Sequence, residues 1–388
     1  MNVLMISLDA TLLTDREKTV EDSQARHVLY GKYLSQLFIV VRAGKSKKTR
    51  KLSDNVTVYP AASGSLYFVW DAYRISKRVS GENKIDVITA QDPLLTGMVG
   101  YLTKKRYNIP LNVQLHGNYL NNIIWLKQSK FNYFLNMAGN YIVKKADSIR
   151  VVAEGIGQRL ASKLNIPSEK FITLPVPTDV GRFITYSQNN RLKEDIAEFE
   201  NVILFVGRLS KEKNVEVLLV AAKKVLLRYP KALFLIVGDG PMRESLQKLA
   251  QRMEIGQNTR FEGSVSYKNI PGYYHSCDVL VLPSKHEGWG RVAIEGLACG
   301  KAVIVSDVCG VADLVTGKEL GFTFPPDSPS TLADRIIQLL GNSDMREEMG
   351  TRGREYVKET MDIEKNAPEF AELYRKTVEL SGKKCQSG

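Results

Sequence analysis

Cysteine and histidine are scarce in this sequence, with four of each among 388 residues. The cysteines are scattered, form no CxxC pair, and stand at Cys277, Cys299, Cys309 and Cys385; the histidines are equally dispersed. Such spacing gives neither a disulfide framework nor a His/Cys metal site. We therefore expect a reduced, cytoplasmic protein that holds no metal.

Long apolar runs are also missing. No stretch approaches the roughly 18 residues of a membrane-spanning helix, and the first residues, MNVLMISLD, lack the basic start of a secretory signal. The composition, 44% hydrophobic and 25% charged, is otherwise that of a globular protein and excludes disordered or coiled-coil polymers. At about 150 residues per domain, the length predicts two domains that are soluble or attached to a membrane only from the side.

Acidic residues are few in the N-terminal half alone. Residues 1–177 contain 25 lysines and arginines against 13 aspartates and glutamates, whereas the rest contains 29 of each, so the first half carries the whole net charge of +12. This asymmetry points to an anionic partner for that half, such as nucleic acid, phospholipid or a phosphorylated substrate.

Short apolar runs alternate with segments of helical period along the chain. Most runs are apolar on both faces, as buried parallel strands are, and repeated βα units favour parallel sheets. The alternation breaks at residues 174–177 (LPVP) and 186–198, so the predicted fold class is α/β, with two tandem Rossmann-like lobes joined near residue 180. After residue 328 we expect three helices and no strand. Strands are expected over residues 3–8, 38–42, 56–60, 86–90, 112–115, 148–153, 171–175, 202–206, 232–237, 260–262, 279–283 and 302–306.

Two such lobes bind ligands at the carboxyl ends of their strands, here in a cleft between the lobes, so the loops that follow strands are the expected sites of chemistry. One such loop in the second lobe begins with Gly207 and Arg208 and reaches Lys213 at the start of the next helix. Its two cations can clamp a diphosphate. The alternative is that both are solvated surface residues.

A second loop contains Gly238 and Gly240 after an apolar strand. The dinucleotide fingerprint GxGxxG fails here, because Arg243 occupies the third glycine position. We interpret the loop as a glycine turn beside a nucleotide, or as a plain structural turn.

The most specific pattern covers residues 283–296, PSKHEGWGRVAIEG. It indicates a strand end, a glycine-rich loop and a helix that begins near Gly290, whose free N–H groups favour an anion such as pyrophosphate. Glu287 precedes the helix and Glu295 lies about one and a half turns inside it, so two carboxylates can accept hydrogen bonds from two hydroxyl-bearing parts of one ligand. Glu295 lies in an otherwise apolar segment, which argues against a solvated glutamate.

This pair of glutamates resembles the E-x7-E signature of retaining, nucleotide-sugar-dependent glycosyltransferases of family 4, which have the GT-B fold. The resemblance extends to GRL at 207–209 with KN at 213–214, GDGP at 238–241, ACGKAV at 298–303 and HG at 116–117. It is dense over residues 200–315 and thin before residue 110. It implies an acceptor lobe over residues 1–180, a donor lobe over residues 181–360 and a tail, residues 361–388, whose helix returns to the first lobe.

The resemblance also implies a role for each site residue. Arg208 and Lys213 would neutralise the donor diphosphate, Glu295 would hold the ribose, and Glu287 the hydroxyls of the transferred sugar. His116 would contact that sugar near the reacting carbon, unless it is a capped loop histidine. Fixed cations and a helix N-terminus at the leaving group would stabilise the transition state, so no metal is required. Further donor contacts are implied for Gly207, Gly238, Gly240, Gly288, Trp289, Gly290, Arg291 and Val292.

One departure concerns the loop after the first strand. Family members often carry a Gly-Gly pair there, whereas the first glycine of this chain is Gly31. The corresponding segment, residues 21–27, enters a helix at about residue 23, where small side chains permit close approach and an arginine either faces phosphate or lies on the surface. The acceptor loop of the first lobe is assigned to Ser23, Gln24, Ala25 and Arg26.

The resemblance implies a retaining, metal-independent hexosyltransferase. It would move a sugar from a nucleotide diphosphate-sugar, with uridine favoured as the base, to a glycan or lipid-linked acceptor in polysaccharide or glycolipid synthesis. The nucleotide-sugar is a co-substrate and no cofactor is expected. An epimerase or hydrolase of the same fold is an alternative, although an epimerase would require more carboxylates and histidines around the sugar. A basic nucleic-acid-binding protein fits the charge, but no RNP-like, KH-like or zinc motif accompanies it.

The first lobe also predicts a peripheral protein at the inner face of the cell membrane. Residues 42–51 contain six cations and no acid, and residues 104–106 and 144–145 add five more. Residues 119–141 are rich in Tyr, Ile, Trp, Phe and Leu, a composition that suits an amphipathic helix in an anionic interface. The alternative is that these apolar residues form the core of the lobe and the cations a solvated face.

Overall fold

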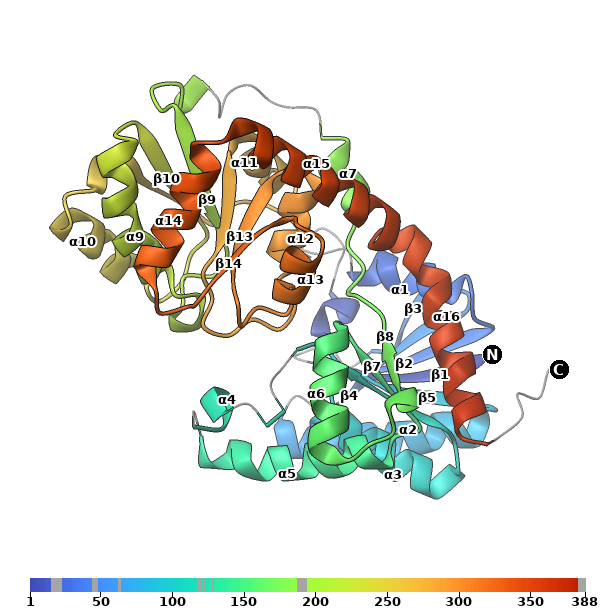
Figure 1. Cartoon of the computed structure of the whole chain (residues 1–388). Coiled ribbons are helices and arrows are strands. Elements are labelled where there is room, and N and C mark those ends of the chain that lie inside the picture. Colours follow the sequence, from blue (N-terminus) through green and yellow to red (C-terminus); the bar gives the residue numbers. More distant parts are fainter. Residues whose placement is uncertain are drawn as a thin grey trace. The chain divides into compact units, whose positions relative to one another are not determined.

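The structure is a computed structural model that describes residues 1–14, 23–43, 48–61, 64–117, 120–121, 123–127, 129–186 and 194–382. It divides into two compact units. The first consists of Met1–Pro175 with Glu364–Gly388, and the second of Val176–Ile363. Figure 1 shows each unit as a sheet flanked by helices.

The first unit is built on a sheet in the order β3-β4-β2-β1-β5-β6-β7-β8. All neighbouring strands are parallel except β3 and β4. Parallel strands are covered on both faces, which explains why β1, β2 and β5 are almost entirely apolar and buried. The strands are β1 Asn2–Ser7, β2 Gln36–Arg42, β3 Arg50–Ser53, β4 Val56–Ala61, β5 Val87–Ala90, β6 Leu111–Leu115, β7 Ser148–Val151 and β8 Phe171–Thr173.

Helices cover both faces of this first sheet (Figure 1). They are η1 Ala10–Leu13, α1 Ser23–Gly31, α2 Ser65–Glu82, α3 Leu95–Tyr107, α4 Ile123–Lys127, α5 Lys130–Lys145, α6 Glu154–Leu164, η3 Ser168–Lys170 and α16 Ile363–Leu380.

The second unit has a parallel sheet in the order β11-β10-β9-β12-β13-β14. Its strands are β9 Asn201–Val206, β10 Ala232–Val237, β11 Thr259–Gly263, β12 Val279–Leu282, β13 Ala302–Ser306 and β14 Gly321–Phe324. Its helices are α7 Val180–Ile184, η4 Lys211–Lys213, α9 Val215–Arg228, α10 Arg243–Arg252, η5 Gly256–Asn258, α11 Ile270–Ser276, α12 Arg291–Ala298, α13 Ala312–Gly317, α14 Pro329–Leu340 and α15 Ser343–Thr360.

Every strand expected from the sequence is present within a few residues, but β3 and β14 were not predicted. Both lie at the edge of a sheet. Edge strands are half exposed, and β3, with the sequence RKLS, carries polar side chains that hide the strand pattern. The three helices expected after residue 328 are confirmed as α14, α15 and α16.

The single helix expected over residues 119–141 is wrong. Two helices, α4 and α5, occupy this stretch, because Ser129 caps α5 by accepting a hydrogen bond from the backbone N–H of Phe131. Tyr119, and residues 44–47 of the basic segment 42–51, lie outside the described residues.

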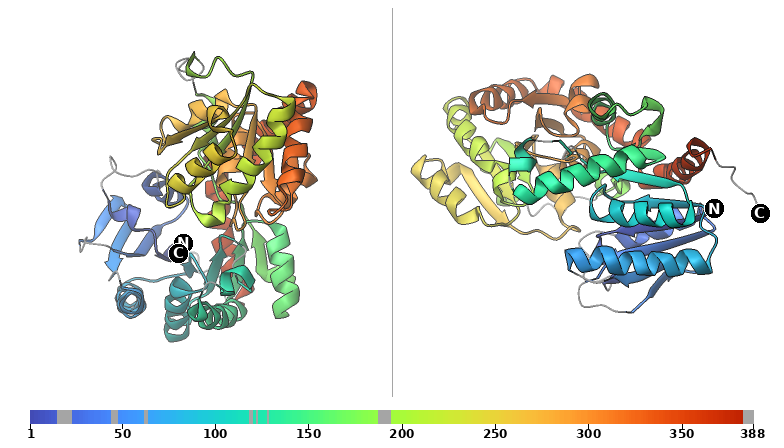
Figure 2. Two further views of the ribbon diagram at one scale, coloured as in Figure 1. Left: turned by 90° about the vertical axis from the view of Figure 1, so that its left-hand side faces the viewer. Right: turned by 90° about the horizontal axis from the view of Figure 1, so that it is seen from below.

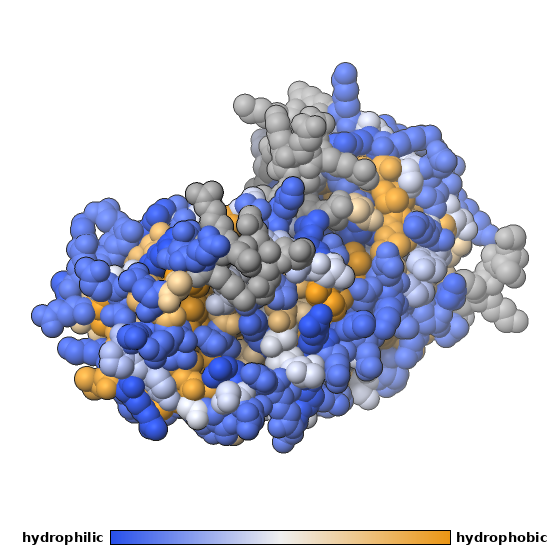
Figure 3. Space-filling view, turned by 90° about the horizontal axis from the view of Figure 1, so that it is seen from above, coloured by the Kyte–Doolittle hydropathy of each residue, from blue (hydrophilic) through white to orange (hydrophobic). Residues whose placement is uncertain are grey.

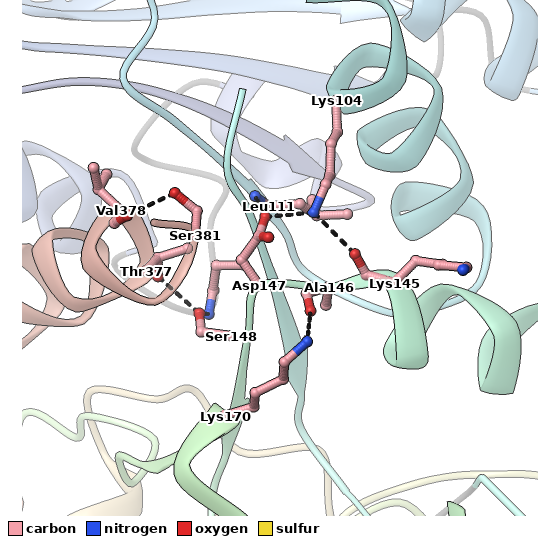
Figure 4. A network of polar contacts seen from close by, with 11 residues as sticks. Lys104, Leu111, Lys145, Ala146, Asp147, Ser148, Lys170, Thr377, Val378 and Ser381 are labelled. Carbon is pink, nitrogen blue, oxygen red and sulfur yellow. Dashed lines mark hydrogen bonds and ion pairs between the residues drawn. The ribbon is translucent and has the colours of Figure 1, made fainter. Parts of the chain in front are cut away.

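The return of the C-terminal helix to the first unit is confirmed. Thr377 of α16 meets Ser148 at the start of β7, with 2.7 Å between their buried hydroxyl oxygens (Figure 4). Phe370 and Tyr374 of the same helix are almost fully buried in the apolar core beneath β1 and β2. The helix is therefore part of the first unit's core rather than an appendage.

Truncating Phe370 should destabilise the first unit strongly. Its ring is 4% exposed, stacks on Tyr30 with 4.5 Å between ring centroids, and lies under the guanidinium of Arg150 at 5.0 Å. We expect Phe370→Ala to lower the free energy of unfolding by about 3–5 kcal/mol, measured by guanidinium chloride titration. The matched control Phe131→Ala, at a side chain 56% exposed, should change it by less than about 0.5 kcal/mol. Equal effects of the two substitutions would contradict this placement of the helix.

Candidate functional site

The loops after β9 and β12 meet at one edge of the second sheet. These strands are neighbours, while β10 and β11 lie on the other side of β9, so the strand order reverses here. Such a switch point is where doubly wound sheets bind ligands. Lys213, from the loop after β9, forms an ion pair with Glu287, from the loop after β12. The backbone N–H of Lys285 donates to the carbonyl of Glu212 at 2.8 Å and ties the two loops together.

The cations of this edge differ in their surroundings. The Lys213 and Glu287 side chains are 21% and 17% exposed, so their pair is partly shielded from water. Arg208 is exposed and forms no ion pair with any residue that the structure describes. One cation is thus held by a carboxylate, and the other is open to an incoming anion.

The two glycines of the loop after β10 are explained by backbone packing. A Cβ atom at Gly240, where φ is 159°, would lie 2.4 Å from the carbonyl oxygen of Leu209. The backbone N–H of Leu209 in turn donates to the carbonyl of Asp239 at 2.9 Å. The glycines therefore let this loop lie directly on the loop that carries Arg208.

Helix α12 begins at the same edge. Gly290 is its N-cap with φ 88°, and a Cβ atom there would approach the Cys309 sulfur to 2.6 Å. No side chain caps the helix at Gly290, and the positive end of the helix dipole lies at this edge of the sheet. The neighbouring Trp289 is 6% exposed, and its buried indole N–H has no hydrogen-bond partner in the described part of the chain.

Glu295 is held in place by partners that the sequence did not reveal. It is 5% exposed and accepts hydrogen bonds from the Tyr274 hydroxyl at 2.7 Å and from Nε of Arg291 at 3.1 Å. The Arg291 guanidinium also donates to the Tyr267 hydroxyl at 2.8 Å. Burial, followed by the nearby Glu295 carboxylate, raises the pKa of Tyr274 well above its usual value, so the phenol stays a donor.

The second unit therefore brings its predicted residues to one edge of the sheet. They are Gly207, Arg208, Lys213, Gly238, Gly240, Glu287, Gly288, Trp289, Gly290, Arg291, Val292 and Glu295. The sequence offered no signal for Tyr267 and Tyr274, which lie more than fifteen residues from the glutamate they support.

In the first unit, His116 follows β6 and is held between two side chains. Its Nδ1 lies 3.4 Å from a guanidinium nitrogen of Arg150 and its Nε2 lies 3.1 Å from Oε1 of Gln91. Because a guanidinium only donates, Nδ1 is the acceptor and Nε2 carries the proton. Burial, then the charges of Arg150 and Arg26, lower the pKa of His116 to about 3. The imidazole is neutral at physiological pH.

Of the residues assigned to the acceptor loop, Ser23 and Gln24 are buried and bonded within the unit. The Ser23 hydroxyl donates to Asp9, and the Gln24 amide donates to the carbonyls of Thr11 and Thr14. These side chains hold the loop against the end of β1. Ala25 and Arg26 are half-buried, and the charge of Arg26 contributes to the lowered pKa of His116.

Two histidines of the first unit, His27, which is buried, and His116, which is half-buried, should make the protein less stable in mild acid. Burial lowers the pKa of His27 to about 4 and that of His116 to about 3, against an ordinary 6.5. Below pH 6.5 the histidines of the unfolded chain therefore bind protons, whereas those of the native chain stay neutral. At pH 5 each histidine should lower the free energy of unfolding by about 2 kcal/mol relative to pH 8. Urea unfolding at both pH values measures this, and His27→Gln should remove about half of the difference. Equal unfolding free energies at pH 8 and pH 5 would rule out buried neutral imidazoles.

The sequence models of two families match consecutive parts of the chain. The family described as Glycosyltransferase Family 4 matches residues 36–182, and the one described as Glycosyl transferases group 1 matches residues 187–356. The chain belongs to glycosyltransferase family 4. An uncharacterized glycosyltransferase of Methanocaldococcus jannaschii is 28% identical over 292 residues, which are 75% of this chain and 76% of the relative.

Solved structures share the fold of this glycosyltransferase. Sucrose-phosphate synthase of Thermosynechococcus elongatus superposes with a TM-score of 0.79 at 22% identity, covering 97% of this chain and 98% of the other. HepE of Anabaena, solved in complex with UDP, superposes with a TM-score of 0.77 at 16% identity, covering 96% and 99%. HepE is also solved with UDP-glucose. The predicted GT-B fold of two Rossmann-like lobes is confirmed.

The described residues contain neither a cluster of metal ligands nor a helix that could span a membrane. They contain no group of three or more His, Cys, Asp and Glu side chains that could hold a metal ion. None of their helices is both long enough and apolar enough to cross a membrane. Cys277, Cys299 and Cys309 are buried and free, and Cys385 lies outside the described part of the chain.

Proposed function

We propose that this glycosyltransferase takes a sugar from UDP-sugar with retention of anomeric configuration and without a metal. The acceptor is a glycan or a lipid-linked saccharide of polysaccharide or glycolipid synthesis. The observation that carries the proposal is the Lys213–Glu287 pair at the switch point of the second sheet, beside the open cation Arg208. HepE, a protein of the same fold, is solved with UDP and UDP-glucose, which supports UDP as the leaving group.

Arg208 and Lys213 take the diphosphate in this proposal. Negative charge grows on the leaving UDP as the bond to the sugar breaks, and fixed cations stabilise it most when they are preorganised. The positive end of the α12 dipole, the backbone of Gly288 and the indole N–H of Trp289 add neutral stabilising groups at the same edge. These groups supply the electrostatic stabilisation that a divalent metal would otherwise give.

Glu287 changes partner when the donor binds. In the free protein its carboxylate neutralises Lys213. A diphosphate draws the ammonium group away, because it offers more negative charge than one carboxylate. The released carboxylate then accepts hydrogen bonds from the hydroxyls of the transferred sugar.

Glu295 holds the ribose. Tyr274 and Arg291 each donate to one of its oxygens. Each carboxylate oxygen has two lone pairs, so an oxygen that accepts from one of these side chains can also accept from a ribose hydroxyl. The carboxylate is preorganised by its partners and needs little ordering when the nucleotide arrives.

His116 contacts the transferred sugar as a neutral group. Its depressed pKa, caused by burial and by Arg150, makes the imidazole too weak a base to take the proton of the acceptor hydroxyl. Proton transfer from the acceptor hydroxyl then falls to the leaving phosphate rather than to this imidazole.

A transfer assay with a panel of nucleotide-sugars and saccharide acceptors tests the function. UDP-sugars should be the preferred donors, NMR of the product should show the anomeric configuration of the donor, and EDTA should leave the rate unchanged within about twofold. Loss of activity on chelation that magnesium or manganese restores would overturn the metal-free site. Release of free sugar at the same rate with and without acceptor would indicate a hydrolase.

A further inference from the structure

Helix α5 presents apolar side chains to solvent. Phe131 and Phe134 are 56% and 55% exposed, Tyr141 is 50% exposed and Met137 is 69% exposed. A surface helix of a globular protein normally turns its polar face outward. The buried residues of α5 are Gly139, Ile142 and Val143, which lie in the C-terminal half of the helix. Packing against the sheet therefore does not account for the aromatic residues.

The exposed aromatic residues belong to a groove shared by three helices. Figure 2 shows α2, α3 and α5 side by side on one face of the first unit, in the view from below. The groove has a volume of about 300 Å³. It is lined by Trp70 and Tyr73 from α2, Met98 and Leu102 from α3, and Phe131 and Phe134 from α5. In Figure 3, which looks from the opposite side, hydrophobic residues form only small separate patches.

The helices around the groove are positively charged. Helices α3, α4 and α5 together contain seven lysines and arginines and no aspartate or glutamate. Lys104 is already paired with Asp147 at 2.6 Å (Figure 4). The exposed cations of these helices that form no ion pair with a described residue are Lys105, Arg106, Lys127, Lys130, Lys144 and Lys145. Positive charge and exposed apolar side chains thus occur together on α3, α4 and α5, which contain no acidic residue, whereas α2 contributes Asp71 and Glu82.

We propose that this aromatic–basic face, formed by α2, α3, α4 and α5, binds the surface of an anionic lipid bilayer. Aromatic rings such as Trp70 and Phe134 favour the headgroup region, where an apolar body meets water. Lysines on the same helices reach lipid phosphates with their charged ends while their stems cover apolar surface. A bilayer satisfies both features at once, because it offers apolar depth and a dense negative charge. The inference concerns the first unit alone and does not depend on the donor site.

The contribution of the lysines to membrane binding is tested by flotation of the full chain with lipid vesicles. We expect binding to phosphatidylcholine vesicles that contain about 30% phosphatidylglycerol, and none to phosphatidylcholine alone. Binding should weaken as sodium chloride rises from about 0.1 M to about 0.5 M. The triple variant Lys127→Gln, Lys130→Gln, Lys144→Gln should bind about 100-fold more weakly. The matched control Lys223→Gln, Arg252→Gln, Lys268→Gln, at exposed cations of the second unit, should bind like the parent.

The aromatic contact is tested by tryptophan fluorescence. Trp70 is 67% exposed, so its emission should shift to shorter wavelength and resist acrylamide on the anionic vesicles, and Trp70→Phe should remove most of the shift. Phe131→Ser with Phe134→Ser should weaken vesicle binding roughly tenfold. Leu227→Ser, at an 85% exposed leucine of α9, is the control that should change nothing. All these side chains are exposed, so unchanged thermal midpoints verify that the variants are folded.

Two results would overturn the proposal. One is equal binding to neutral and anionic vesicles with no change in Trp70 emission. The other is a dimer of the free protein in sedimentation that Phe134→Ser dissociates, while vesicle binding persists, because the occupant of the groove would then be a second copy of the chain.

Discussion

Replacing Lys213 by alanine is expected to lower kcat/KM for sugar transfer by about 100- to 1,000-fold. Two effects add. The developing charge on the leaving diphosphate loses a fixed cation, and Glu287, which is 17% exposed, loses the partner that neutralises it. The fold should survive, because Lys213 lies in the short helix η4 and is not part of either apolar core.

The structure offers a matched control two residues away. Lys211 is an exposed lysine of the same short helix η4 and forms no ion pair with a described residue. Lys211→Ala should lower kcat/KM by less than about threefold. The double variant Lys213→Ala with Glu287→Gln should lose less than the product of the two single losses, because the two side chains are coupled. Parent-like activity of Lys213→Ala would remove it from the site.

Replacing Glu295 by glutamine should lower kcat/KM by about 30- to 1,000-fold, mainly through weaker donor binding. The amide keeps the shape of the carboxylate but turns an NH2 group toward Tyr274 or Arg291, both of which donate. The substitution thus removes a charged hydrogen-bond acceptor and places two hydrogen-bond donors against each other.

Two further variants separate the carboxylate from its support. Tyr274→Phe removes one hydrogen bond to the Glu295 carboxylate. It should reduce the affinity for the nucleotide-sugar about tenfold, while the pH dependence of the rate stays the same. Glu347→Gln, at an exposed glutamate of α15, should have no effect. Equal donor affinity for Glu295→Gln and Glu347→Gln would rule out a ribose contact by Glu295.

Much of this architecture follows from apolar patterning. Strands such as β9 and β10 are buried on both faces, so their residues are continuously apolar and easily found. Lys213 and Glu287 could be placed at one edge because each follows a strand of a parallel sheet. Their ion pair could not be predicted, because the sequence does not show that β9 and β12 are neighbouring strands.

Other features depend on contacts that sequence spacing does not encode. Tyr274 reaches Glu295 from another helix, and Gln91 and Arg150 reach His116 from two other strand ends. The break between α4 and α5 depends on a single serine cap. The exposure of Phe131 and Phe134 was also open, because an apolar helix can turn either face to the sheet.

Calorimetric titration of the full chain with UDP in the presence of EDTA is the sharpest test of a metal-free UDP site in the second unit. We expect binding at one site per chain, weakened at least tenfold by Glu295→Gln and left unchanged by Glu347→Gln. No binding of UDP by the parent, or equal binding by both variants, would contradict it.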